Sequence, residues 1–95
     1  MPIPDATPEI SVILPFYNAE DTLERAIMSI AAQSHENFEC LLINNNSTDR
    51  STDIARKWIH RDTRFTLLHE SKQGVMHASN TGSMAARGIF IARMD

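Results

Sequence analysis

The regular structure of this chain begins with Ile10-Ser11-Val12-Ile13-Leu14, a short and nearly continuous apolar stretch that Pro15 ends. A run of this kind is typical of a β-strand that is covered on both faces. Further apolar runs follow at residues 40–43, 65–68 and 90–94. The four runs predict four strands.

Helices are predicted between these strands. Apolar residues recur at helical spacing over residues 19–33 and again from residue 49 or 51 onward, and a third segment at 75–86 is rich in small residues. Asn18 is expected to cap the first helix. Strands that alternate with helices of this length indicate βαβ crossovers. The sequence therefore predicts an α/β fold of order β-α-β-α-β-α-β, a Rossmann-like parallel sheet with helices on both faces.

Polar or aromatic residues follow every predicted strand, at 15–18, 44–49, 69–73 and at Asp95. In parallel α/β sheets, ligands bind beyond the carboxyl ends of the strands, where the strand order reverses. These residues are therefore the candidate site. The segment 44–49 is a polar turn whose residue types tolerate unusual backbone angles, and Asp49 is expected to position this turn or cap the next helix.

Composition and charge narrow the function classes. The chain has 95 residues, a net charge of −3 and 42% hydrophobic residues. This length allows one domain or part of one, the acidic balance argues against nucleic acid as a partner, and the hydrophobic content argues against a disordered tail. Residues 1–48 hold one basic and seven acidic residues, whereas 49–95 hold eight basic and five acidic ones, so an anionic ligand would meet the second half.

The glycines and the cysteine add two constraints. Glycine occurs only at positions 74, 82 and 88, which excludes a GxGxxG or Walker A loop after the first strand. Cys40 is the sole cysteine, and residues 1–9, an expected flexible lead-in with three prolines, do not resemble a signal peptide. We therefore expect a cytoplasmic location, with association at the membrane periphery open for the full-length protein.

Four segments at the strand ends resemble the motifs of family 2 glycosyltransferases. Residues 11–20 (SVILPFYNAE) are similar to the family's first strand with its Pro-x-Tyr-Asn turn, and residues 43–49 (INNNSTD) to its hydrophobic-Asp-Asp-Gly-Ser-Thr-Asp motif. Residues 74–82 (GVMHASNTG) resemble its Gly-x-x-x-Ala-Arg-Asn-x-Gly helix, and residues 88–95 (GIFIARMD) resemble the strand before its Asp-x-Asp metal motif. The resemblance implies a partial GT-A fold, with 10–95 as its nucleotide-sugar-binding part, truncated at the metal motif.

The resemblance also implies roles for individual residues. Tyr17 would stack on the nucleotide base, an interaction worth about 1–3 kcal/mol. Asn44, in place of the family's Asp, would accept the N3–H of uracil through its amide oxygen. Asp95 would contact ribose and help place Mg²⁺ or Mn²⁺, which favour carboxylate and phosphate oxygens. The complete set of implied nucleotide-binding residues is Pro15, Phe16, Tyr17, Asn44, Asn45, Asn80 and Asp95, with Asp95 as the metal ligand.

The third motif departs from the family pattern at one position. Ser79 stands where the family has arginine, so a cation that could pair with phosphate is missing there. Arg87 could substitute, although it lies two helical turns further along the chain. The small residues of this segment, including Ala78 and Gly82, are also suited to packing of a helix against the sheet.

The resemblance implies an inverting glycosyltransferase that moves a sugar from a nucleotide-sugar, expected to be UDP-linked, to a hydroxyl of a carbohydrate or lipid-linked acceptor. No catalytic residue is assigned in this chain, which is expected to be inactive alone and to self-associate through the strand at 90–94. A non-catalytic nucleotide-binding or interaction module stays open as the alternative, because the acidic pair and the arginine are absent. Asn18 and Asn44 argue against a receiver-like signalling domain, which needs acids there.

Overall fold

The computed structural model describes residues 7–94 and confirms the predicted order of strands and helices. The strands are β1 (Ile10–Phe16), β2 (Phe38–Asn44), β3 (Phe65–His69) and β4 (Phe90–Arg93). The helices are α1 (Leu23–Ala31), α2 (Ser51–Arg61) and α3 (Val75–Ala85). Residues 1–6 of the predicted lead-in, and Asp95, lie outside the described residues.

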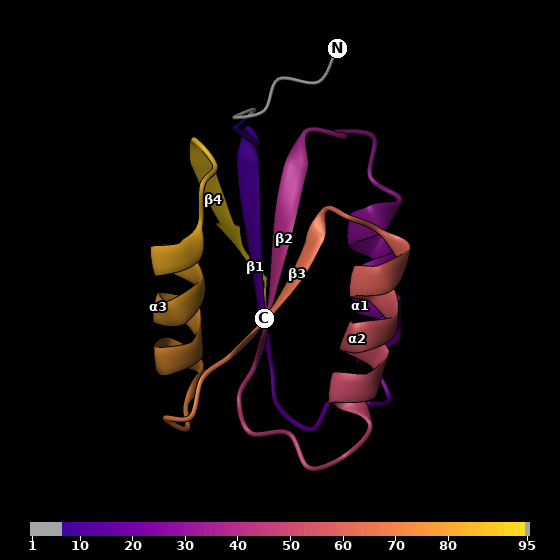
Figure 1. Cartoon of the computed structure of the whole chain (residues 1–95), viewed down its shortest axis with the longest axis vertical. Coiled ribbons are helices and arrows are strands. Elements are labelled where there is room, and N and C mark those ends of the chain that lie inside the picture. Colours follow the sequence, from indigo (N-terminus) through magenta and orange to yellow (C-terminus); the bar gives the residue numbers. More distant parts are fainter. Residues whose placement is uncertain (1–6, 95) are drawn as a thin grey trace.

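The four strands form one parallel sheet in the order β3-β2-β1-β4. Ile10 of β1 is in register with Phe38 of β2 on one side and with Phe90 of β4 on the other. The chain moves outward from β1 to β3 and then returns to place β4 beside β1 (Figure 1). The strand order therefore reverses at the β1–β4 junction, which is the position where ligands of such sheets bind.

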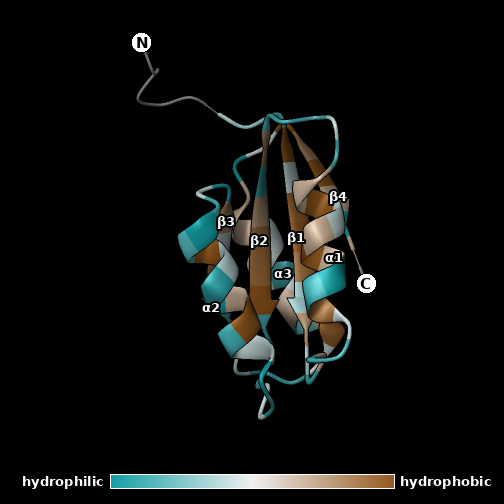
Figure 2. Cartoon of the chain, turned by 90° about the vertical axis from the view of Figure 1, so that its right-hand side faces the viewer, coloured by the Kyte–Doolittle hydropathy of each residue, from teal (hydrophilic) through white to brown (hydrophobic). Residues whose placement is uncertain are grey.

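Helices cover both faces of the sheet, as predicted. Helices α1 and α2 lie on one face and α3 lies on the other (Figure 1). Alternation along β1 sends Val12 and Leu14 into a core cluster shared with α1 and α2, and Ile13 into a smaller cluster shared with α3. Figure 2 shows the same arrangement by hydropathy, with hydrophobic strands beside helices that carry hydrophilic segments.

Small residues allow α3 to lie close to the sheet. Ala78 is completely buried, and a Cβ atom added at Gly82 would come within 2.6 Å of Ile13 Cγ2 and 2.9 Å of Ile43 Cδ1. Contacts this short are not tolerated in folded proteins without movement of the neighbours. The predicted packing role of these two residues is therefore confirmed.

The predicted cap of the first helix is wrong. Helix α1 begins at Leu23 after Thr22, later than the expected start near residue 19, and Thr22 makes no side-chain capping bond. Asn18 instead has a φ of 46° and uses its side-chain oxygen to accept hydrogen bonds from the backbone N–H groups of Thr48 and Asp49. A contact distant in sequence has thus replaced the local one.

A buried carboxylate fixes the connection between α3 and β4 at the amino-terminal end of the sheet. Glu39 accepts hydrogen bonds from the Ser11 hydroxyl at 2.5 Å and from the Arg87 backbone N–H at 2.7 Å. Gly88 N–H donates to Ser11 Oγ at 2.7 Å, so all four residues form one network. Burial raises the pKa of Glu39, but the hydrogen bonds from Ser11 and Arg87 outweigh it, so this pKa lies below the ordinary value.

Cys40, next to Glu39 on β2, is a core residue. Its side chain is completely buried. Burial, together with the nearby charges of Asp62 and Glu39, raises the pKa of the thiol to about 12. The thiol therefore stays protonated near neutral pH and is not suited to act as a nucleophile.

Candidate functional site

Hydrogen bonds join the loops that follow β1 and β2 at the carboxyl edge of the sheet. Besides the Asn18 contacts, the backbone N–H of Ala19 donates to Ser51 Oγ at 2.7 Å and that of Glu20 donates to Asp49 Oδ2 at 3.1 Å. Asp49 Oδ1 also accepts a hydrogen bond from the Ser51 N–H at 2.9 Å. Asp49 therefore positions the turn, as the sequence predicts.

The amide of Asn44 is used within its own turn and toward β3. Its Oδ1 accepts a hydrogen bond from the Ser47 N–H at 2.9 Å. Its Nδ2 lies 3.2 Å from His69 Nδ1 and is the donor of that pair, because the amide oxygen is already the acceptor for Ser47. Asn44 is buried, and both ends of its amide have partners.

Asn45 joins the loop after β2 to the loop after β3. Its side chain, only 3% exposed, donates to the carbonyl oxygens of Glu70 and Lys72, both at 2.9 Å. Its Oδ1 accepts the Gly74 N–H at 2.8 Å, at the start of α3. Only an amide can donate and accept in this way, since an ionised carboxylate has no N–H to offer the two carbonyls.

Asn46 takes the left-handed backbone conformation at the centre of this turn. Its φ is 67°, a value that asparagine tolerates better than most residues other than glycine. Its Nδ2 donates to the Ser71 carbonyl at 2.9 Å and to Gln73 Oε1 at 3.1 Å. The asparagine run therefore holds the three loops at the carboxyl edge in one arrangement.

A cavity of about 220 Å³ lies between these loops and the start of α3. Tyr17, which is 53% exposed, forms part of its wall. Its lining residues are Pro15, Phe16, Tyr17, Asn45, Gln73, Gly74 and Val75, and we call it the β1 cavity. Four predicted site residues thus come together here, whereas Asn44 is not among the lining residues.

A second cavity, of about 170 Å³, lies between α3 and β4. Its lining residues are Val75, Met76, Ser79, Asn80 and Arg93, and we call it the β4 cavity. The two cavities share Val75. Of the predicted site residues, Asn80 lies in this second cavity, and Asp95 lies outside the described residues.

The sequence model of glycosyl transferase family 2 matches residues 11–95, nearly the whole chain. The chain belongs to this family. Among its relatives, EpsJ of Bacillus subtilis, an uncharacterized glycosyltransferase, is 39% identical over 88 residues, which cover 93% of this chain and 26% of EpsJ. Glycosyltransferase GlyG of Streptococcus pneumoniae is 36% identical over 87 residues, 90% of this chain and 29% of GlyG.

Solved structures agree with this assignment and with the GT-A fold. S. aureus TarS in complex with UDP-GlcNAc superposes with a TM-score of 0.84 at 25% identity, covering 92% of this chain and 26% of that one. The Pyrobaculum calidifontis mannosyltransferase PcManGT, in complex with GDP-Man and Mn²⁺, has a TM-score of 0.76 at 28% identity, covering 90% and 26%. The family 2 chain described here therefore spans about a quarter of the length of these proteins.

The structure adds cavity residues that the motifs alone do not single out. Gln73 and Val75 line the β1 cavity, and Arg93 lines the β4 cavity. Gln73 does belong to the segment after the third predicted strand, so the strand-end rule includes it without giving it a role. Gln73 is recognised only because the loop after β3 approaches Asn45 and Asn46, and this approach depends on the tertiary fold.

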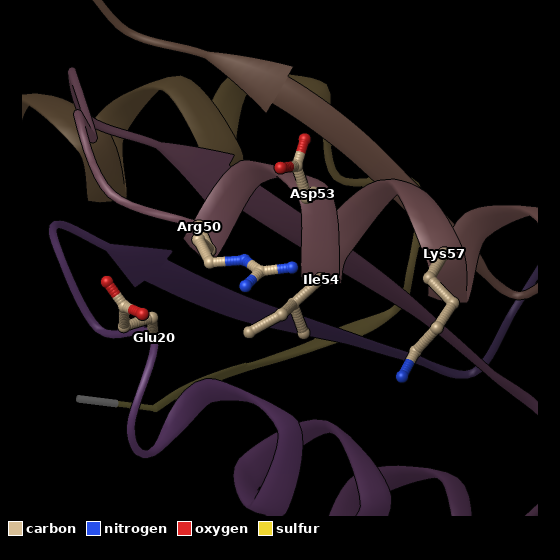
Figure 3. Close-up of a pocket in the computed structure, with 5 residues that line it drawn as sticks. All are labelled: Glu20, Arg50, Asp53, Ile54 and Lys57. Atoms are coloured by element: carbon tan, nitrogen blue, oxygen red, sulfur yellow. The ribbon is translucent and has the colours of Figure 1, made fainter.

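A third cavity, of about 370 Å³, lies between the loop before α1 and helix α2. Figure 3 shows Glu20 on that loop, with Arg50, Asp53, Ile54 and Lys57 on the segment that starts and forms α2. Two acidic and two basic side chains line it, so the lining charges favour neither an anion nor a cation. No predicted site residue lines this cavity.

Neither a cluster of three metal-ligating side chains nor a membrane-spanning helix occurs in the part of the family 2 chain that the structure describes. No group of three His, Cys, Asp or Glu side chains in residues 7–94 could hold a metal ion. In the same range, no helix is long and apolar enough to cross a membrane.

Proposed function

We propose that this chain binds the donor in an inverting glycosyltransferase that transfers sugar from a UDP-sugar to an acceptor hydroxyl. The observation that carries the proposal is the β1 cavity, which lies at the carboxyl end of β1 and brings Pro15, Phe16 and Tyr17 together with the loops after β2 and β3. It adjoins the position where the strand order reverses. TarS with UDP-GlcNAc and PcManGT with GDP-Man, which share this fold, support a nucleotide-sugar as ligand.

Tyr17 supplies the aromatic face for the nucleotide base. It is half exposed at the cavity wall, so a planar base can stack on it without displacing core residues. Such stacking is worth about 1–3 kcal/mol and does not by itself select one base. Selection of uracil must therefore come from polar groups at the edge of the base.

Gln73 is the side chain in the β1 cavity that is best placed to read that edge. Its Nε2 makes a single long contact of 3.4 Å with Asn45 Oδ1, and its Oε1 accepts one hydrogen bond from Asn46. One amide N–H and one oxygen lone pair remain for a ligand. They match the O4 acceptor and the N3–H donor of uracil. Asn44 and Asn45, whose amides are engaged internally, support the cavity wall in this proposal.

In this proposal, the diphosphate and the metal ion bind on the β4 side of the site. Mg²⁺ is usually bound through one or two carboxylates together with substrate phosphates, so the carboxylate of Asp95, which follows β4 in the sequence, would suit Mg²⁺ or Mn²⁺ together with the diphosphate. Such an ion would neutralise the charge that develops on the diphosphate leaving group. Asn80, in the β4 cavity, can donate a hydrogen bond to ribose or phosphate oxygen.

We assign no catalytic base to the described residues. In the proposed reaction, a base deprotonates an acceptor hydroxyl of a carbohydrate or a lipid-linked sugar, and the hydroxyl oxygen attacks the anomeric carbon with inversion. We further propose a cytoplasmic location, which agrees with the single, buried Cys40.

Nucleotide titration followed by NMR tests the proposal. UDP should shift the amide signals of Tyr17, Gln73 and Gly74 more than ADP does at equal concentration. Tyr17→Ala should weaken UDP binding roughly tenfold, because it removes the stacking face. Arg56→Ala, on the exposed surface of α2, should bind UDP as the wild type does. Equal shifts with ADP, or shifts confined to residues 53–64, would show that the β1 cavity is not the base site.

A non-catalytic nucleotide-binding module remains the second candidate function. The observation that favours it is that both asparagines at the family's acidic positions are used in internal hydrogen bonds. Both candidates predict UDP binding, and they differ in sugar transfer. Acceptor-dependent release of UDP from UDP-sugars by the full-length protein would exclude the module, and its absence across an acceptor panel would favour it.

A further inference from the structure

Arg93 is a cation that the fold leaves free beside the β4 cavity. Four other basic side chains in residues 7–94 have acidic partners within that range: Arg56 with Asp53, Lys57 with Glu24, Arg64 with Asp62 and Arg87 with Glu39. Arg93 makes no ion pair and no hydrogen bond to any residue in that range. Its exposed guanidinium is therefore available for a ligand.

The register of β4 directs Arg93 toward α3. Arg93 pairs with Ile13 of β1, and residues in register on neighbouring strands share one face of the sheet. Ile13 belongs to the core cluster under α3, so Arg93 lies on the α3 face as well. There it lines the β4 cavity with Ser79 and Asn80, and none of the described residues that line this cavity is acidic.

The position of Arg93 bears on the cation that is missing at Ser79. The resemblance to family 2 places an arginine at residue 79, and the sequence suggests Arg87 as its substitute. The structure excludes Arg87, because this residue is bound to Glu39 at the amino-terminal end of the sheet. Arg93 instead reaches the same cavity as Ser79 from the neighbouring strand.

We infer that Arg93 binds the diphosphate of the nucleotide-sugar and supplies from β4 the positive charge that α3 lacks at Ser79. The inference rests on the proposed function. The two cavities share Val75, so a nucleotide whose base occupies the β1 cavity extends its phosphates toward the β4 cavity. A guanidinium donates two parallel N–H bonds to phosphate oxygens, which makes arginine well suited to this role.

The test compares UDP with uridine on the complete 95-residue chain. NMR titrations are carried out in EDTA, so that the guanidinium is tested without a metal ion. The variants are Arg93→Ala, Arg93→Lys, the double variant Ser79→Arg with Arg93→Ala, and Arg56→Ala as a control of equal charge. Arg93 is exposed on an edge strand, so its substitutions should leave the amide spectrum of the core unchanged.

Arg93→Ala should weaken UDP binding about tenfold and leave uridine binding unchanged, because uridine carries no phosphate. Arg93→Lys should fall between the wild type and Arg93→Ala, since it keeps the charge but loses the paired N–H bonds. The double variant should regain most of the lost UDP affinity, and Arg56→Ala should match the wild type.

Two outcomes would overturn the inference, and they are distinguishable. If UDP binds at Tyr17 but Arg93→Ala binds it as tightly as the wild type, Arg93 has no role in diphosphate binding and the proposed function stands. If neither UDP nor uridine shifts Tyr17 in the wild type, the proposed function fails and the inference fails with it.

Discussion

The two sides of the sheet differ in how completely they are built. On one side, α1 and α2 cover the sheet with a continuous core that includes Val12, Leu42 and Ile27, and we call this side the α1/α2 layer. On the other side, α3 packs over β1 and β2 through Ala78 and Gly82, while all four residues of β4 are exposed. We call α3, the edge strand β4 and the connection between them (residues 75–93) the α3/β4 flank. The exposed large apolar residues of this flank are Val75, Met76, Met84, Ile89, Phe90 and Ile91.

The difference separates stability from binding. Regions with many buried apolar contacts open at the free energy of global unfolding, whereas regions with few such contacts open more easily. The α1/α2 layer is therefore expected to hold the fold together. The α3/β4 flank carries Asn80 and Arg93 and lines the β4 cavity, so it is the side that we propose for the binding of ligands and partners.

The largest expected effect compares one isoleucine from each side. Ile27 of α1 is completely buried, whereas Ile91 on β4 is 49% exposed. Ile27→Ala should lower the free energy of unfolding by about 2–5 kcal/mol, because it leaves a cavity in the core. Ile91→Ala should cost less than about 1 kcal/mol. Urea denaturation followed by circular dichroism gives both values. Similar losses of unfolding free energy for the two variants would show that the α1/α2 layer does not contribute more to stability than the α3/β4 flank.

The second prediction concerns the loops where the two sides meet. Asn45→Asp restores the residue type that the family usually has, but it should lower the free energy of unfolding by about 1–3 kcal/mol. The reason is that a carboxylate cannot donate to the carbonyls of Glu70 and Lys72 and would face both of them. The same urea measurement applies.

Asn46→Asp is the matched control for this substitution. Asn46 is exposed, and water can replace its bonds to Ser71 and Gln73, so the cost should be clearly smaller. If Asn45→Asp is as stable as the wild type, the amide of Asn45 is not what holds the loops after β2 and β3 together.

Much of the fold could be predicted because its signals are local. The apolar runs at β1 and β2 and the helical spacing in α1 depend only on neighbouring residues. The cap at Asn18 could not be predicted in this way. Its side chain can bond either to its own helix or to a distant loop, and the contact with Thr48 and Asp49 exists only after β1 and β2 pair.

The candidate site shows the same limit. The strand-end rule located Pro15, Phe16, Tyr17 and Asn45, because parallel strands end at one edge of the sheet. It could not show that the Asn44 amide is occupied by Ser47 and His69, or that Arg93 shares a cavity with Ser79. Both facts depend on register and on the distance between elements, which the sequence pattern does not encode.

The third prediction is that the α3/β4 flank mediates self-association. β4 pairs with β1 on one side, and no strand among residues 7–94 pairs with its other side. An exposed strand edge with apolar side chains is a template for pairing with another chain, and a two-fold axis would cover both edges at once. Light scattering should be measured at 10 µM and at successively tenfold higher concentrations. The average mass should rise from that of the monomer toward that of the dimer.

Ile91→Lys should shift this equilibrium toward the monomer, because it places a charge on the exposed edge. Met28→Lys, on the exposed surface of α1, is the matched control and should associate as the wild type does. A monomer mass for the wild type at every concentration would show that Arg93 and the strand's own geometry protect this edge.

The smallest expected effect tests the link between the two sides at the amino-terminal end of the sheet. Glu39 of β2 holds Ser11 of β1 and Arg87 before β4 in one network, and its pKa lies below the ordinary value. A carboxylate with a lowered folded-state pKa adds stability that is fully present above its unfolded pKa and is lost as pH falls through the folded one.

The free energy of unfolding of the wild type should therefore exceed that of Glu39→Gln most at pH 7. This difference between the two proteins should narrow as pH falls below about 4.5, the ordinary pKa of glutamate. Other carboxylates with lowered pKa values, such as Asp62, titrate in both proteins and cancel in the difference. Urea denaturation at pH 7, 5, 4 and 3 measures this difference, and a difference that stays constant over this range would mean that the charge of Glu39 does not hold the flank to the layer.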